Sequence, residues 1–304
     1  MTDNMPTGYP YFDRANLLLR SNFRAFADIL ARSNDAFGDL WIREFEDMLS
    51  HLFPSEDLLA AGLQAYVKFA MESVRLQAAF EKVGAYRGSS YEEASKRVYR
   101  NEDYMMSEYL PGLLLSHYLW PHHYRQLVFF DNAFVRPAKN VAISRFVEVG
   151  VGTGVYSRRM LEAISTAVGT GYDVSPSAKR FALRHLSAYG LSDRYSLKLQ
   201  DVVMNRPSEQ FHTLICVEVL EHLEDPVEFL RALRQMLIPG GRAFITAAVS
   251  ADHTDHVYLY RTAADVEAHV TEAGFAIEQS FAAGAYALKY RGQAVPLAAA
   301  FIAM

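Results

Sequence analysis

Three glycines at alternate positions follow a short apolar run that contains an acid. The run is Arg145–Val149, the acid is Glu148, and the glycines are Gly150, Gly152 and Gly154. A β-strand that enters such a turn before a helix exposes backbone N–H groups, which can approach a bound nucleotide closely. The nicotinamide fingerprint G-x-G-x-x-G would need a glycine where this chain has Val155. The turn therefore predicts a nucleotide-like cofactor and argues against a nicotinamide dinucleotide.

Two further acids, Asp173 and Asp201, stand at the ends of predicted strands. A carboxylate at the carboxyl end of a strand can accept hydrogen bonds from two neighbouring hydroxyl groups, such as those of a ribose. Each acid also has an ordinary interpretation, since Glu148 could lie on the surface and Asp173 could cap a helix. Their joint order and spacing favour a cofactor site.

The order of these motifs resembles that of class I S-adenosylmethionine (SAM)-dependent methyltransferases, over residues 145–249. The matching segments are Gly150-Val-Gly-Thr-Gly154, Tyr172-Asp-Val-Ser-Pro-Ser-Ala178, Leu199-Gln-Asp-Val-Val203, Cys216-Val-Glu-Val-Leu-Glu-His-Leu-Glu-Asp-Pro226 and Leu237-Ile-Pro-Gly-Gly-Arg242. The resemblance implies an α/β fold, namely a seven-stranded Rossmann-like methyltransferase sheet with an antiparallel last strand. In this chain an N-terminal α-helical domain would precede it.

The resemblance also implies roles for individual residues. Glu148 would lie near the methionine moiety of SAM, Asp173 would hold the ribose hydroxyls, and Asp201 would face the adenine amino group. S-adenosylhomocysteine would be the product of the cofactor. The cofactor-binding residues implied in this way are Glu148, Gly150, Gly152, Gly154, Asp173, Val174, Asp201, Val202 and Glu218.

The pattern of apolar residues predicts the elements that position these motifs. From residue 141 onward strands and helices alternate, which indicates a mostly parallel sheet with helices on both faces. Residues 11–134 have apolar residues at helical spacing, and Arg136–Asn140 is typical of a linker. We therefore expect a helical domain at 1–138, for substrate binding or oligomerisation, and a SAM-binding domain at 139–304. The strands expected are 145–149, 169–174, 195–201, 211–218, 241–249, 276–283 and 295–303, and the helices are 155–167, 176–190, 226–237 and 262–273.

Two groups of side chains are candidates for binding or activating the methyl acceptor. The first is His122, His123, Tyr124 and Arg125, because arginine can clamp a carboxylate and aromatic faces stabilise a cation. The alternative is that this aromatic segment only packs the helical domain onto the sheet. The second group follows the predicted strand 241–249 and consists of His253, His256 and Tyr260.

The two histidines of the second group, with the acids beside them, raise the possibility of a metal site. A metal needs a third ligand at a dedicated spacing, and the sequence shows none, so substrate binding or a polar loop is favoured and no metal is expected. His222 belongs to the strand motif at 216–226 and is expected only to support the cofactor.

The segment Tyr109–Arg125, on a helical domain of this size, resembles a bacterial group of methyltransferases that act on free amino acids. The group includes the methionine S-methyltransferases that open one route to dimethylsulfoniopropionate, and amino-acid N-methyltransferases. The resemblance implies a small amino acid as substrate, with L-methionine favoured and S-methylmethionine as product. The alternatives are an N-, O- or C-methyltransferase of another amino acid or specialised metabolite, and a non-catalytic SAM-binding scaffold.

The composition is that of a folded protein without nucleic-acid partners. Of 304 residues 51% are hydrophobic and 21% charged, and the formal charge of −5 lacks the basic excess of nucleic-acid binders. The single cysteine, Cys216, excludes an intramolecular disulfide. Neither a signal peptide nor a membrane span is evident, so a cytoplasmic location is expected. Trp41 and Phe53, expected to be exposed, favour a homodimer or a higher homo-oligomer.

Overall fold

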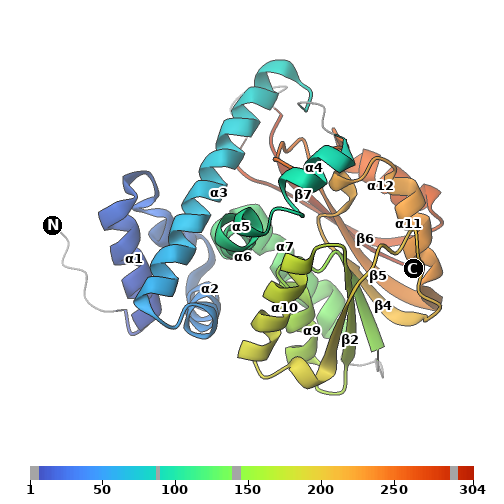
Figure 1. The fold of residues 1–304 in the computed structure, drawn as a ribbon, viewed down its shortest axis with the longest axis horizontal. Coiled ribbons are helices and arrows are strands. Elements are labelled where there is room, and N and C mark those ends of the chain that lie inside the picture. The colour runs from blue at the N-terminus through green and yellow to red at the C-terminus, as the bar shows by residue number, and fades with distance from the viewer. Residues whose placement is uncertain (1–6, 87–89, 139–144, 288–293) are drawn as a thin grey trace.

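The computed structural model describes residues 7–86, 90–138, 145–287 and 294–304. Figure 1 shows α1, α2 and α3 on one side of α6, and the sheet with α9–α12 on the other. None of the helices in these segments is both long enough and apolar enough to span a bilayer. The helices of the first part are α1 (Pro10–Asn22), α2 (Ile29–Leu52), α3 (Glu56–Val83), α4 (Tyr91–Arg97), α5 (Glu102–Tyr104), α6 (Leu110–Leu119), α7 (Pro121–Phe129) and α8 (Arg136–Ala138).

Seven strands form one sheet in the order β3-β2-β1-β4-β5-β7-β6. The five strands from β3 to β5 pair in parallel, whereas β7 runs antiparallel to both β5 and β6. The predicted seven-stranded sheet with an antiparallel last strand is therefore confirmed. The strands are β1 (Arg145–Val149), β2 (Val168–Asp173), β3 (Tyr195–Leu199), β4 (Phe211–Cys216), β5 (Leu237–Val249), β6 (Ile277–Gly284) and β7 (Leu297–Ala303).

Local signals in the sequence explain where the helices flanking the sheet begin. The side chains of Ser175 and Asp225 accept hydrogen bonds from backbone N–H groups of the first turns of α10 and α11, and a proline stands at the first position of each helix. Thr262 and Asp265 form a capping box on α12. These helices are α9 (Val155–Ala163), α10 (Pro176–Ala188), α11 (Pro226–Gln235) and α12 (Ala263–Glu272).

Two apolar cores cover the two faces of the sheet. One lies between the sheet and α11 and α12. The other extends from the sheet through α9 and α10 into the N-terminal helices. At its centre the ring of Phe244, on β5, lies 4.9 Å from that of Phe130 and 5.6 Å from that of Phe134. Phe130 and Phe134 belong to a π-helical segment, η3 (Phe130–Val135), so the helical part is packed directly onto the sheet.

Close helix packing in the first part depends on a glycine. A Cβ atom on Gly112, in α6, would lie 2.5 Å from Cβ of Phe69 in α3, so only glycine allows α6 this close to α3. The approach matters because α3 and α6 both contribute side chains to the large cavity described below.

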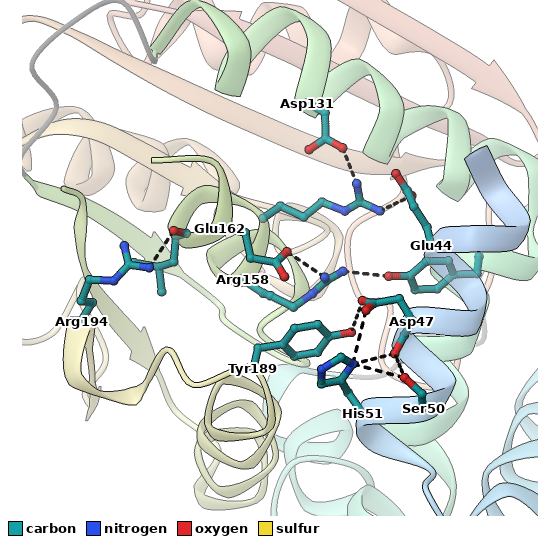
Figure 2. A network of polar contacts seen from close by, with 12 residues as sticks. Glu44, Asp47, Ser50, His51, Asp131, Arg158, Glu162, Tyr189 and Arg194 are labelled. Atoms are coloured by element: carbon teal, nitrogen blue, oxygen red, sulfur yellow. Dashed lines mark hydrogen bonds and ion pairs between the residues drawn. The ribbon is translucent and has the colours of Figure 1, made fainter. Parts of the chain in front are cut away.

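A polar network also joins the helical part to the sheet. The guanidinium of the buried Arg159, on α9, pairs with Asp131 of η3 and, at 2.7 Å, with Glu44 of α2. Its neighbour Arg158 pairs with Glu162 at 2.8 Å and donates to the hydroxyl of Tyr118 at 2.9 Å. In Figure 2 Glu44 and Asp131 face the same region between α2 and α9, with Arg158 beside them.

Most element boundaries agree with the sequence prediction, and the exceptions have physical causes. β5 begins at Leu237 rather than 241, because Leu237 already pairs with Phe211 of β4. The register then shifts, and pairing resumes between Arg242 and Thr213. Helix continues through Ala138, so the first half of the predicted linker is helical, and residues 139–144 lie outside the described residues. Trp41 and Phe53 are buried, not exposed, so they give no support to a homodimer.

We expect Arg159→Met to lower the free energy of unfolding by about 2–4 kcal/mol, because it leaves two partly buried carboxylates without a cation. Urea unfolding followed by circular dichroism measures this change. The matched control is Arg231→Met on α11, whose ion pair with Glu272 is exposed, and which should cost less than about 1 kcal/mol. Equal losses in the two variants would contradict a joining role for Arg159.

Candidate active site

A cavity of about 1030 Å³ lies at the carboxyl ends of the parallel strands. One wall comes from the turns that follow β1, β2 and β4, and the opposite wall comes from α3, α6 and α7. Open α/β sheets bind ligands at this edge. The volume is at the upper end of the usual range for ligand sites, about 300–1,000 Å³, so it can hold a cofactor together with a small acceptor.

The glycine turn forms part of the first wall. Gly150 and Gly152 have φ values of +75° and +53°, in the left-handed region, and both line the cavity. A Cβ atom on Gly150 would lie 2.4 Å from Cγ2 of Val219, so a side chain cannot be accommodated there. Gly154 does not line the cavity. With φ +78° it stands at the N-cap of α9, where a Cβ atom would lie 3.1 Å from Cβ of Ala182. Its contact with the cofactor stays a prediction.

Asp173 ends β2, and its carboxylate is fixed by the backbone. It accepts hydrogen bonds from the N–H of Gly152 at 3.1 Å and of Ser175 at 2.8 Å. Burial raises the pKa of Asp173, and these N–H groups oppose that effect. Each carboxylate oxygen has a second lone pair that a ligand hydroxyl could use. Asp201, Val202 and Val174 also line the cavity.

Glu148 lies deeper, on β1, and is almost fully buried. Its carboxylate accepts hydrogen bonds from the backbone N–H of Ser157, at 3.2 Å, and from the hydroxyl of the same residue. Burial raises the pKa of Glu148 to about 8, so the group holds a proton at neutral pH when no cation is beside it.

Two more acids, Glu218 and Glu221, line the cavity after β4. Glu218 has a φ of +50°, and its carboxylate accepts a hydrogen bond from the hydroxyl of Thr246 at 2.7 Å. Burial raises the pKa of Glu218 to about 7. Burial, together with the neighbouring Glu218, also raises the pKa of Glu221 well above its ordinary value.

The opposite wall is aromatic and contains the predicted His122 and His123. The ring of Trp120 lies 5.7 Å from that of His122 and 4.8 Å from that of His123. Burial lowers the pKa of His122 to about 3 and that of His123 well below its ordinary value, so both are neutral at pH 7. Tyr66 and Phe69 of α3 complete this wall, although the sequence analysis did not single them out.

His253, in the loop after β5, is held by a buried acid. Its Nδ1 lies 2.8 Å from Oδ1 of Asp255, whose Oδ2 accepts hydrogen bonds from the hydroxyls of Tyr99 and Tyr109 at 2.9 Å and 2.8 Å. Burial alone would raise the pKa of Asp255, but the nearby histidines hold it well below its ordinary value. Nε2 of His253 is buried without a hydrogen-bond partner, so it can accept a proton from a ligand in the cavity.

His256 also lines the cavity, whereas three other candidates from the sequence do not. The hydroxyl of Tyr124 donates to Glu44 at 3.2 Å, and Tyr260 pairs with His269 at 3.0 Å. Arg125 is exposed, and its guanidinium lies 5.7 Å from the centre of the Phe37 ring. The reason is helical phase, because His122, His123 and Gln126 share one face of α7 while Tyr124 and Arg125 point elsewhere.

Known proteins are similar to this chain in sequence and in fold. Residues 147–243 match the family model described as a methyltransferase domain. The chain is 34% identical over 108 residues to a ubiquinone biosynthesis O-methyltransferase of Pseudomonas syringae pv. tomato, covering 35% of this chain and 45% of that protein. A protein of the same name from Xanthomonas euvesicatoria pv. vesicatoria is 32% identical over 114 residues, 37% of this chain and 46% of its own length.

The chain thus spans about half the length of the curated relatives it matches. Among solved structures, mitomycin 7-O-methyltransferase MmcR aligns with 97% of this chain and 94% of its own, with a TM-score of 0.55 and 14% identity, which shows a shared fold. Residues 147–243 are therefore similar to a methyltransferase domain, and the chain shares the fold of mitomycin 7-O-methyltransferase MmcR.

Proposed function

We propose that the protein is a SAM-dependent methyltransferase that methylates a small molecule. The observation that carries the proposal is one cavity joining the glycine turn and the strand-end acids to the aromatic wall of the helical part. SAM would bind with its ribose at Asp173, its adenine beside Asp201 and Val202, and its methionine moiety near Glu148. In this arrangement residues 139–304 would bind the cofactor and residues 1–138 the acceptor.

Methyl transfer from a sulfonium is an in-line displacement. The bond from the methyl carbon to the sulfur of SAM breaks as the bond to the acceptor forms, and the electron pair stays on the sulfur of S-adenosylhomocysteine. The protein must align the three atoms and exclude water. The helical part is suited to both tasks, because it covers the strand ends and presents rigid aromatic side chains to the cavity.

For the acceptor we propose the thioether of L-methionine, which would give S-methylmethionine. The sulfur is neutral and carries no proton, so no base is needed. The faces of Tyr66, Phe69 and Trp120 would stabilise the sulfonium product. Arg125 does not line the cavity and so cannot clamp the substrate carboxylate there. We assign this task to Arg32, an exposed arginine that does line the cavity.

A hydroxyl or amine acceptor is the second candidate, and the His253–Asp255 pair favours it. Such an acceptor must lose a proton, and Nε2 of His253 is free to take it. The curated relatives are named O-methyltransferases, which supports the same alternative. A homo-oligomer and a cytoplasmic location remain predictions, and light scattering coupled to size-exclusion chromatography tests the first.

An assay of the purified protein with SAM and a panel of acceptors distinguishes these candidates. The panel contains L-methionine, other free amino acids and small phenols, and mass spectrometry identifies the methylated product. We expect S-methylmethionine and an equal amount of S-adenosylhomocysteine. Methionine left unchanged while an amine or phenol gains the methyl group would refute the sulfur acceptor, and SAM binding without turnover of any acceptor would indicate a scaffold.

Variants of three residues test the proposed roles of individual side chains in the same assay. Arg32→Ala should raise KM for methionine by about 10- to 100-fold, because it removes a charge-assisted hydrogen bond, whereas Arg125→Ala should not. His253→Ala should lower kcat by about 10²- to 10⁴-fold for an acceptor that loses a proton, and far less for a thioether.

The raised pKa of Glu148 predicts that SAM affinity depends on pH. In the free protein burial holds the pKa near 8, so the group is mostly protonated at pH 6 to 7. A cationic ligand favours the ionised form, so binding releases the proton, and affinity should rise with pH up to about 8, by at most about tenfold per unit.

Calorimetry in buffers of different ionisation enthalpy measures both affinity and proton release. The amino group of SAM titrates in the same range, so the decisive quantity is the difference between variants. Glu148→Gln should bind SAM with a weaker pH dependence, whereas Glu267→Gln on the exposed face of α12 should behave as the native protein. If the pH dependence of SAM affinity is unchanged in Glu148→Gln, the proton released on binding comes from a group other than Glu148.

A further inference from the structure

Three side chains at one wall of the cavity have the arrangement of a metal site. One ligand atom from each of Glu221, His222 and His256 lies within 4.8 Å of the other two. Glu221 and His222 belong to the short 3₁₀ segment η5 (Leu220–His222) after β4, and His256 belongs to the loop after β5. All three line the cavity, so an ion between them would be accessible to a ligand bound there.

The hydrogen bonds of the two histidines leave the same ring nitrogen free on each. Nδ1 of His222 lies 3.1 Å from the backbone oxygen of Asp255, and Nδ1 of His256 lies 2.7 Å from that of Ala251. A carbonyl oxygen only accepts, so Nδ1 carries the proton in both rings and the lone pair is on Nε2. Histidines that bind metals are typically oriented by this kind of hydrogen bond.

The third member of the group is an acid without a cation. The carboxylate of Glu221 is fully buried, and neither oxygen has a hydrogen bond of normal geometry, although the backbone N–H groups of Glu221 and Ala248 lie nearby. The carboxyl group of Glu218 lies beside it. In the segments that the structure describes, no lysine or arginine forms an ion pair with either acid. Burying such a pair is costly unless a positive charge or a shared proton compensates.

We propose that Glu221, His222 and His256 bind one divalent transition-metal ion at the wall of the cavity. Two imidazoles and one carboxylate suit Zn²⁺, Fe²⁺ or Mn²⁺ better than Mg²⁺ or Ca²⁺, which prefer oxygen ligands alone. Three protein ligands leave at least one position open, as in catalytic rather than structural sites. His253 is not part of the set, because it has no ring nitrogen within 4.8 Å of all three ligand atoms.

This proposal reverses the expectation of no metal. That expectation rested on the lack of a third ligand at a regular spacing from His253 and His256 in the sequence. The structure brings the remaining ligands from η5, more than thirty positions earlier in the chain. The two segments meet because β4 and β5 are adjacent and parallel, so the turns after them lie side by side.

The open position would take an oxygen or nitrogen atom of a bound molecule. This second step rests on the proposed function, since it concerns the acceptor. A hydroxyl bound to a divalent ion loses its proton more readily than a free one. The binding of the metal itself does not depend on SAM. An experiment can therefore refute the metal site without refuting the proposed function, or the reverse.

Calorimetric titration of the full chain, without an affinity tag and after treatment with a chelator, tests the metal site. We expect one Zn²⁺ or Mn²⁺ ion per chain in the absence of SAM, with an affinity at least tenfold higher than that for Mg²⁺. Glu221→Gln and His256→Ala should each weaken binding by at least tenfold. His212→Ala, which removes an exposed histidine from β4, is the matched control and should not change it.

Circular dichroism of each variant establishes that it is folded, and a separate titration with SAM tests the cofactor site. Loss of metal binding in a folded Glu221→Gln protein that still binds SAM supports the site. The metal site is overturned if the native protein binds no ion, or if Glu221→Gln and His256→Ala bind it as well as the native chain does. In that case a proton shared by Glu218 and Glu221 would compensate for the burial of the two carboxyl groups. Metal binding without SAM binding would support the site and refute the proposed function.

Discussion

A shortage of positive charge in one cavity is the constraint on which the rest of the site depends. Glu148, Asp173 and Glu221 line it in buried positions, and the half-buried Glu218 lies beside them. Among the described lysine and arginine residues, Arg32 lines the cavity. Desolvation disfavours the charge of each acid, and a bound cation restores it. A sulfonium cofactor and a divalent metal are both ligands that this electrostatic environment favours.

The helical part makes that environment possible because it removes water from the strand ends. Its contact with the sheet has an apolar component, around Phe130 and Phe244, and a polar component, around Arg159 and its two carboxylate partners. The polar component fixes α2 and η3 against α9, the helix that begins at the glycine turn. The position of the aromatic wall is thereby tied to the turn that would hold the cofactor.

The sequence predicted the sheet and the acids at its edge well, because these depend on short-range patterns. Gly150 directly follows β1, Asp173 ends β2 and Asp201 comes two residues after β3, so their position in the fold follows from their position in the chain. The acceptor side was predicted less well. Arg125 and Tyr124 were chosen by residue type, but the phase of α7 turns them away from the cavity. Arg32, Tyr66 and Glu221 reach the cavity from elements distant in sequence, which a local pattern cannot reveal.

The charge balance of methyl transfer links the acceptor to the metal. Transfer from SAM to a thioether turns one sulfonium into another, so the cavity holds one positive charge before and after, and its acids serve substrate and product alike. Transfer to a deprotonated hydroxyl joins an anion to a cation and leaves two neutral products. An anion among these carboxyl groups is strongly disfavoured unless a second cation lies beside it. An ion held by Glu221, His222 and His256 would be that cation. A hydroxyl acceptor would therefore need the charge of the metal, whereas a thioether acceptor does not depend on it.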